Sequence, residues 1–321
     1  MVSEIIDVIE QILIMAGMLA LGFSVGMLFN GIARRVSARI QNRVGPPVYQ
    51  GFMDVFKLFA KKTNITHGWI FDLAALFSVA GIALAFLFLP IAGVTMLSTD
   101  GDLFLILYLL AIPALGFALG AGASGNPNAA VGIMRALMSM LAYELPLVMV
   151  IIAMMVYYNT TSLAKIVAMQ AGLHWAFFIP VFFLGAFVVD MALQGMLMEK
   201  PFDIPVAPHE IATGPMVEFG GKHLGALMLY KMMGTVVETT LFVDLFLGGG
   251  IILSTAQYGW LAYLVNFIIW FVLILLMFLI AILIENVFPR FRIEQAVKFY
   301  WKYDSLVALL ILIWIFVGVS I

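Results

Sequence analysis

Eight apolar stretches, each long enough to cross a lipid bilayer, constrain the fold of this 321-residue chain more than any other feature. A transmembrane α-helix needs ~20 apolar residues, whereas barrel strands would give alternating stretches of about ten. Only 11% of the residues are charged, so a soluble fold would lack the polar surface that water requires. We therefore predict an all-α integral membrane protein, with residues 1–321 forming a single polytopic membrane domain. The predicted transmembrane helices lie at about 12–32, 70–96, 103–122, 136–158, 176–198, 223–247, 261–286 and 304–321.

Lysine and arginine are distributed unevenly between the two sides of these predicted helices. The loops after the first, third, fifth and seventh helices hold all but two of the 16 basic residues, the exceptions being Lys165 and Lys231. Basic loops remain on the cytoplasmic side of a membrane. We therefore expect the large loops to be cytoplasmic and both termini to lie outside. The basic residues of these loops are Arg34, Arg35, Arg39, Arg43, Lys57, Lys61, Lys62, Arg135, Lys200, Lys222, Arg290, Arg292, Lys298 and Lys302.

Three of the predicted cytoplasmic segments are more elaborate than simple connectors. Residues 48–62 place Asp54 and Lys57 on one helical face, which predicts a surface amphipathic helix, with a solvated connector as the alternative. Residues 199–222 are rich in Pro, Gly and acids, and residues 287–303 mix aromatic with basic residues, as an interfacial belt does. Elaborate loops on one side of the membrane indicate that a partner binds there.

Several charged residues fall within or at the edge of the apolar stretches, where each costs about 2.5–3.5 kcal/mol at the centre of a helix. Pro146 has no N–H for the carbonyl four residues back, so that carbonyl can hold water beside Glu144. Lys231 and Glu238 are seven positions apart and therefore share a helix face. The intramembrane charges that we select are Glu144, Asp190, Lys231, Glu238 and Asp244.

These intramembrane charges support two interpretations. Buried acids in a hydrated helix can exchange protons, and chains of such groups carry protons across a bilayer. A buried acid–base pair can also alternate between paired and open states. The alternative is that the charges satisfy one another and have a structural role in the bundle. We favour a proton pathway built on Glu144 and Glu238.

Small residues and the absence of cysteine give two further expectations. Gly22 with Gly26, and Gly116 with Gly120, have the spacing of small-residue pairs at which transmembrane helices pack closely. The chain has no Cys and its four His residues show no metal-ligand spacing. We therefore expect no redox centre, metal site or cofactor in this chain, and any redox chemistry must lie in partner chains.

Two of the basic loops carry motifs that resemble a known family. Residues 34–47 read RRVSARIQNRVGPP and are followed by Asp54, and residues 200–205 read KPFDIP and are followed by Glu210 and Glu218. Together they resemble the eight-helix membrane subunit of respiratory complex I that adjoins the quinone cavity. The same family includes counterparts in energy-converting membrane-bound nickel–iron (NiFe) hydrogenases. The resemblance covers nearly the whole chain.

The departures from the complex I pattern indicate a branch of this family. The complex I pattern has a longer segment after its first Gly-Pro, whereas residues 45–50 here read GPPVYQ. Val206 and Pro208 stand where complex I carries acids. Ala33 and Lys231 each stand where complex I has Glu. These differences resemble the branch that takes electrons from ferredoxin and makes hydrogen or reduces sulfane sulfur, without quinone.

The resemblance implies a non-redox subunit that couples electron transfer to proton or sodium ion translocation in a prokaryotic cell membrane. Its implied partners are peripheral hydrogenase-like and iron–sulfur subunits, which would hold a NiFe centre and iron–sulfur clusters, and antiporter-like membrane subunits. Lipid surrounds the chain, and no nucleic acid is involved. Implied docking residues are Arg39, Arg43 and Asp54, and the implied coupling-loop residues are Asp203, Glu210 and Glu218.

Three alternatives to this function stay open at the level of sequence. The chain could belong to a quinone-reducing complex of the complex I type. It could be a pure anchor whose intramembrane charges are structural. It could also be a free-standing secondary transporter, although we find no inverted repeat of the kind that many transporters use.

Overall fold

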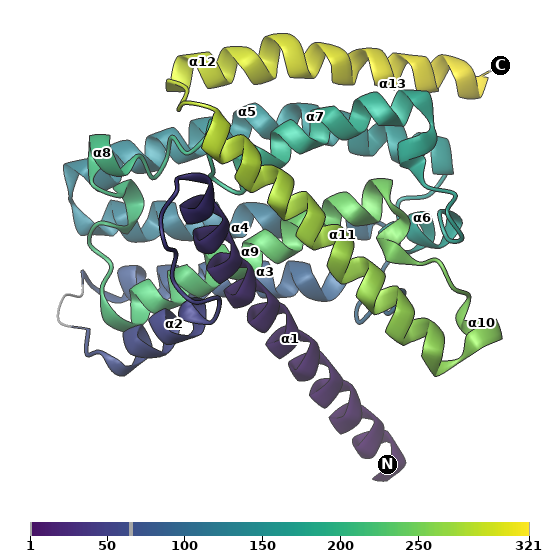
Figure 1. The fold of residues 1–321 in the computed structure, drawn as a ribbon, viewed down its shortest axis with the longest axis horizontal. Coiled ribbons are helices and arrows are strands. Elements are labelled where there is room, and N and C mark those ends of the chain that lie inside the picture. Colours follow the sequence, from purple (N-terminus) through teal and green to yellow (C-terminus); the bar gives the residue numbers. More distant parts are fainter. Residues whose placement is uncertain (1, 64–66, 321) are drawn as a thin grey trace.

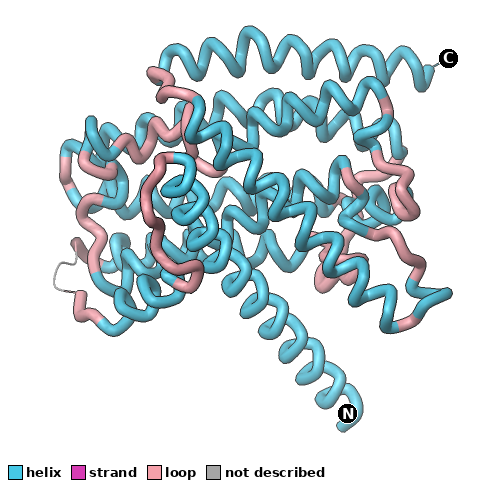
Figure 2. Tube along the Cα trace, in the orientation of Figure 1, coloured by secondary structure: helices cyan, strands magenta, loops and turns pink. Residues whose placement is uncertain are grey.

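The computed structural model describes residues 2–63 and 67–320, and within these ranges the chain is helical with no strand. Figure 1 shows long helices running between two ends of a bundle, and Figure 2 shows the loops gathered at those ends. The all-helical membrane fold is thereby confirmed. Within the described residues, seven helices are long and apolar enough to cross a membrane, and Pro180–Met196 is a shorter apolar helix.

The long helices follow one another up and down the bundle. They are α1 (Val2–Ile40), α3 (Trp69–Phe88), α4 (Asp102–Ser124), α5 (Pro127–Tyr158), α7 (Pro180–Met196), α9 (Gly221–Phe246), α11 (Trp260–Val287) and α13 (Ser305–Ser320). The shorter helices lie in the connections: α2 (Gln50–Ala60), α6 (Leu163–Met169), α8 (Pro208–Ile211), α10 (Thr255–Tyr258) and α12 (Ile293–Lys298). Three-residue 3₁₀ turns occupy η1 (Ala176–Phe178), η2 (Gly214–Met216) and η3 (Gly248–Gly250).

Several helix boundaries differ from the sequence-based predictions. The helix predicted at 70–96 ends at Phe88, and the helix predicted at 136–158 begins at Pro127. The first helix continues to Ile40 and includes Arg34, Arg35 and Arg39, because arginine is a good helix former and hydropathy marks only the lipid-facing part. The last helix begins before the predicted residue 304. Here α12 runs through a π-helical turn, η4 (Phe299–Asp304), into α13, so the predicted interfacial belt is mostly helical.

Helix ends follow local sequence signals where those signals are strong. The N-terminus of α5 is capped by the Asn126 side chain, which accepts a hydrogen bond from the N–H of Asn128, and Pro127 occupies the first turn. Its C-terminus is closed by Asn159 in the left-handed conformation, one of the residues that tolerate it. The apolar length between these caps therefore becomes one continuous helix.

The core is centred on α9, whose residues from Met232 to Phe246 are buried. Helix α9 packs against α1, α3, α7 and α11. A Cβ atom on Gly26 of α1 would overlap the carbonyl group of Met232 on α9, and one on Gly116 of α4 would overlap Ser78 of α3. Both predicted small-residue pairs therefore mark close helix contacts.

One end of the bundle, here named the basic end, carries α2, α8 and the loops at residues 41–49, 197–220 and 288–292. Helix α2 is amphipathic as predicted: Val55 packs against Met27 and Met232, while Phe56 is exposed. In Figure 1 the N-terminal half of α1 projects away from the bundle. Its exposed apolar residues, such as Leu13, are suited to lipid or to a partner helix.

Candidate functional site

Two groups of charged residues form the candidate site. The first group lies inside the bundle on α5, α7 and α9, and the second lies in the loops of the basic end. The intramembrane group is the stronger indication of function, because a charged residue within a membrane is costly.

Glu144 on α5 and Glu238 on α9 line the same cavity, which has a volume of about 30 Å³. Tyr143 and Tyr230 also line it, so four polar side chains surround a space otherwise bounded by Leu, Met and Ala. A polar cavity of this size holds about two water molecules. The sequence-based selection of Glu144 and Glu238 as a pair therefore corresponds to a shared, hydratable space.

The local backbone near Glu144 and the burial of Glu238 determine the surroundings of these two acids. Pro146 lies inside α5 two residues after Glu144, so the backbone there loses one hydrogen-bond donor. Glu238 is only 7% exposed and its helix is the most buried in the bundle. Within residues 2–63 and 67–320, Oε2 of Glu238 has no hydrogen-bond partner. A buried acceptor without a hydrogen-bond partner is a site at which an ordered water or a proton is expected.

Lys231 does not form its ion pair with Glu238, contrary to the pairing that the helix-face argument suggested. Its Nζ atom lies 3.0 Å from Oε1 of Glu199, at the start of the loop after α7. Lys231 and Glu238 do share a second, smaller cavity of about 10 Å³ with Tyr230. Sequence reasoning missed Glu199 because nothing in the local pattern distinguishes it from an ordinary loop acid beside Lys200.

Asp190 and Asp244 lie apart from the cavity that Glu144 and Glu238 share. Asp190 lines an apolar cavity of about 390 Å³ bounded by α7, α9 and α11. Asp244 is fully buried near the far end of α9, and neither carboxylate oxygen has a hydrogen-bond partner in the described part of the chain. Their part in a proton pathway stays a prediction.

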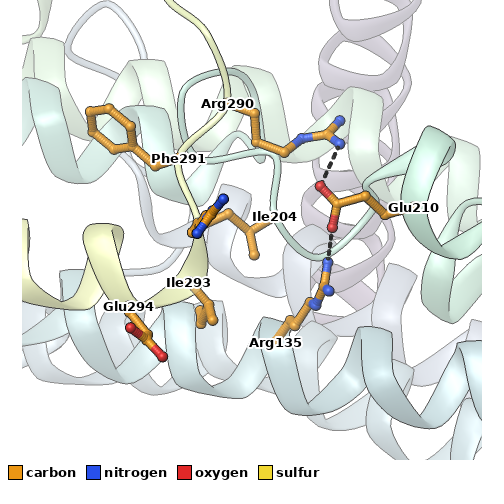
Figure 3. A pocket seen from close by; sticks show the side chains of 8 residues that line it. Arg135, Ile204, Glu210, Arg290, Phe291, Ile293 and Glu294 are labelled. Carbon is orange, nitrogen blue, oxygen red and sulfur yellow. Dashed lines mark hydrogen bonds and ion pairs between the residues drawn. The ribbon is translucent and has the colours of Figure 1, made fainter.

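The loop acids Asp203 and Glu210 are held together by two arginines (Figure 3). Arg290 donates from Nε and Nη2 to the two carboxylate oxygens of Asp203, at 2.7 Å and 2.5 Å. Its Nη1 lies 3.5 Å from Glu210, which also accepts a 2.7 Å hydrogen bond from Arg135 of α5. This bidentate and bridged arrangement fixes the 197–220 loop to α5 and to the segment after α11.

Electrostatics within this loop cluster favours the charged forms. The hydrogen bond and charge of Arg135, with a smaller contribution from Arg290, hold the pKa of Glu210 below its usual range. The hydrogen bonds with Asp203 and Glu210 raise the pKa of Arg290. A cavity of about 420 Å³ opens beside these residues and is also lined by Phe291.

Glu218 closes the other end of the same loop. Its carboxylate accepts a 2.5 Å hydrogen bond from the amide of Asn126 and lies 3.7 Å from Nε2 of His67. Phe219 follows and stacks on Phe71 of α3, with ring centroids 4.2 Å apart. The loop is therefore packed at both ends against the membrane helices.

The predicted docking residues occupy the basic end as expected, but they do not form one cluster. Asp54 of α2 accepts hydrogen bonds from Arg34 at 2.6 Å and from Gln50 at 2.8 Å. Burial raises the pKa of Asp54, but these two hydrogen bonds outweigh burial and the pKa is lowered. Arg39 and Arg43 are exposed at the end of α1. Pairing thus attaches α2 to α1 and leaves two arginines available to a partner.

Comparison with known proteins agrees with the motifs. The sequence profile of a family described as NADH dehydrogenase matches residues 12–316. The chain is 30% identical to a subunit of NADH-quinone oxidoreductase from Carboxydothermus hydrogenoformans, covering 94% of this chain and 87% of that protein. It is 29% identical to a subunit of F(420)H(2) dehydrogenase from Methanosarcina barkeri, covering 90% of each chain.

A solved structure is more similar than these sequence relatives. A chain of the membrane-bound sulfane sulfur reductase, an archaeal respiratory membrane complex, is 42% identical and superimposes with a TM-score of 0.90. The match covers 95% of this chain and 99% of that chain.

Proposed function

The chain belongs to the NADH dehydrogenase family, whose members here are subunits of membrane oxidoreductase complexes, and we propose that it couples electron transfer in a docked redox arm to ion movement across the membrane. In this proposal the chain carries no redox centre of its own. A peripheral arm with iron–sulfur clusters and a NiFe-type site docks on the basic end, and antiporter-like subunits adjoin it in the membrane.

One observation carries the proposal: Glu144 and Glu238, from helices far apart in sequence, line one cavity. Water in that cavity would bridge the two carboxyl groups, and each carboxyl group can accept a proton from water and release it again. Tyr143 and Tyr230 supply hydroxyl groups that can orient such water. A purely structural bundle would gain nothing from two acids facing the same hydratable space.

The loop cluster supports the docking part of the proposal. Asp203 and Glu210 hold the 197–220 loop through Arg290 and Arg135, and Glu199 near the start of the same loop pairs with Lys231. The 197–220 loop therefore carries both the arginine-bridged cluster and the partner of Lys231, so a charge change in an arm bound at this surface could act on Lys231 by moving this loop. The excess of basic residues at this end supports its assignment to the cytoplasmic side.

The identity of the redox partner is proposed from the comparisons and the departures noted above. The 42% identity to a sulfane sulfur reductase chain exceeds the 30% identity to the quinone-linked relative. Val206 and Pro208 lie in the loop where acids of the complex I pattern are missing. We therefore favour an arm of the hydrogenase or sulfane reductase type, with a quinone-reducing arm as the second candidate.

The test is replacement of each acid by its amide in the assembled complex, in sealed vesicles. Glu144→Gln and Glu238→Gln keep the size and much of the hydrogen bonding but remove titration. We expect ion uptake per electron to fall by about an order of magnitude or more, while electron input to the detached arm is unchanged. If both variants move ions normally, the chain is an anchor and the two acids are structural.

A control is needed for Glu238, because its replacement also changes the surroundings of Lys231. The double variant Glu238→Gln with Lys231→Met removes both charges at once. Normal ion movement by the double variant would assign Glu238 a structural role and leave Glu144 alone in the pathway.

A further inference from the structure

We infer that the ammonium group of Lys231 exchanges between Glu199 and Glu238, which makes Glu199 the positioning residue that connects the loop to the proton relay. This inference rests on the proposed function and adds to it a residue outside the family motifs described above. Movement of the 197–220 loop would then change the charge beside Glu238.

The first position of the exchange is the observed one. Nζ of Lys231 lies 3.0 Å from Oε1 of Glu199, and the two side chains are 38% and 27% exposed. This chain does not enclose the ion pair on every side, so the lysine stem has room to move. Glu199 therefore holds Lys231 without fixing it.

The second position is provided by Glu238. Lys231, Gly234 and Glu238 lie on one face of α9, at spacings of three and four residues, and all three line one cavity. Oε2 of Glu238 is buried and, in the part of the chain that the structure describes, accepts no hydrogen bond. The flexible lysine stem can redirect its ammonium toward that oxygen by rotation of its side-chain bonds.

Gly234 keeps the route between the two positions open. A Cβ atom there would lie 3.5 Å from Oε1 of Glu238, with no other described atom within 4 Å outside its own helical turn and neighbours. A methyl group therefore fits without a clash, contacts the Glu238 carboxylate and reduces the small cavity that Lys231 and Glu238 share. Glycine in the interior of a helix is otherwise unfavourable, so its presence on this face needs a reason.

The loop controls the first position through Glu199. The carbonyl of Glu199 accepts a 2.8 Å hydrogen bond from the N–H of Phe202, one residue before Asp203, which Arg290 holds. A displacement of the 197–220 loop would thus carry the Glu199 carboxylate with it. Glu285 of α11 is a further acid close enough to interact with Lys231 electrostatically.

The exchange would change the protonation of Glu238. When Lys231 leaves Glu199 and approaches Glu238, the positive charge favours the carboxylate form of Glu238. The proton released from Glu238 passes to water in the shared cavity and then to Glu144. Return of Lys231 to Glu199 allows Glu238 to take up another proton. No group is oxidised or reduced in this chain.

Gly234→Ala tests the exchange in the assembled complex in sealed vesicles, with Gly122→Ala as the matched control. Gly122 is also in a membrane helix, and a Cβ there would meet no described atom within 4 Å. We expect Gly234→Ala to lower ion uptake per electron about tenfold, as loss of a relay group does, and Gly122→Ala to leave it unchanged.

The outcomes separate this inference from the proposed function. If Gly234→Ala transports like the control while Glu238→Gln does not transport, the relay stands and the exchange is wrong. If Glu238→Gln also transports normally, the proposed function itself is wrong. If the Gly234→Ala complex fails to assemble, the variant Glu199→Gln tests the exchange instead, again by ion uptake in sealed vesicles. Loss of ion uptake with normal electron input to the arm supports the exchange, and unchanged uptake overturns it.

Discussion

At the scale of single residues, Glu210 offers a pH-dependent test of the loop cluster. Arg135 and Arg290 lower the pKa of Glu210, so its carboxylate stabilises the closed loop above the unfolded-state pKa of about 4.3. That contribution is lost only as the pH falls through the lower, folded-state value. We expect amide protection at residues 207–211, corrected for intrinsic exchange, to be constant from about pH 5 to 8 and to fall in stronger acid.

The variant Glu210→Gln is the control for this pH dependence, because it removes the carboxylate and keeps the shape. Its amide protection at neutral pH should match that of the unmodified chain in acid. A decline in protection between pH 5 and 8 in the unmodified chain would contradict the assignment to Glu210, whose pKa lies below that range.

The sequence predicts individual residues of the candidate site better than it predicts their partners. Glu144 and Glu238 can be identified from the sequence as candidate functional residues, because an acid in an apolar stretch is costly. The structure places both in the lining of one cavity. The sequence does not reveal that Lys231 pairs with Glu199 or that Asp203 pairs with Arg290. Ion pairs across 32 and 87 positions depend on which helix ends meet, and no local pattern encodes that.

At the scale of helices, Gly26 tests the contact between α1 and α9. A Cβ atom at Gly26 would overlap the backbone carbonyl of Met232, which cannot move without shifting the helix. We expect Gly26→Ala to destabilise the chain by about 1–3 kcal/mol, as overpacking does elsewhere. The measurement is the midpoint of heat-induced aggregation in detergent.

Gly17→Ala on the same helix is the matched control, since a Cβ there would have no described neighbour within 4 Å. It should leave the midpoint unchanged or raise it slightly, because alanine is the better helix former. Equal midpoints for Gly26→Ala and Gly17→Ala would mean that α1 and α9 do not approach closely at this point.

Helices were predicted well where apolar length and caps agree, and less well where they do not. The helix predicted at 136–158 begins earlier in the structure, at Pro127. Asn126 caps its N-terminus, and the cap lies before the apolar run that the prediction used. The predicted start of the last helix, residue 304, lies after the observed start, because the π-helical turn carries polar residues such as Lys302 and Asp304. Hydropathy reports contact with lipid, whereas helix length depends on hydrogen bonding.

At the scale of the whole molecule, the distribution of basic residues makes the orientation in the membrane testable. The chain has no cysteine, so single cysteines can be labelled without background from this chain. Val44 at the basic end is 92% exposed, and Tyr258 at the opposite end is 51% exposed. We expect a membrane-impermeant thiol reagent to label Val44→Cys only in inside-out vesicles and Tyr258→Cys only in right-side-out vesicles.

The physical reason for this expectation is that basic loops resist transfer across the membrane during insertion, which would keep the basic end cytoplasmic. Labelling is scored on the band of this chain, so that cysteines of partner subunits do not contribute. The reverse pattern would place the proposed docking surface outside the cell, where a cytoplasmic redox arm could not reach it. With the expected pattern, addition of the detached arm to stripped inside-out vesicles should slow labelling of Val44→Cys, because Val44 lies between the exposed Arg39 and α2.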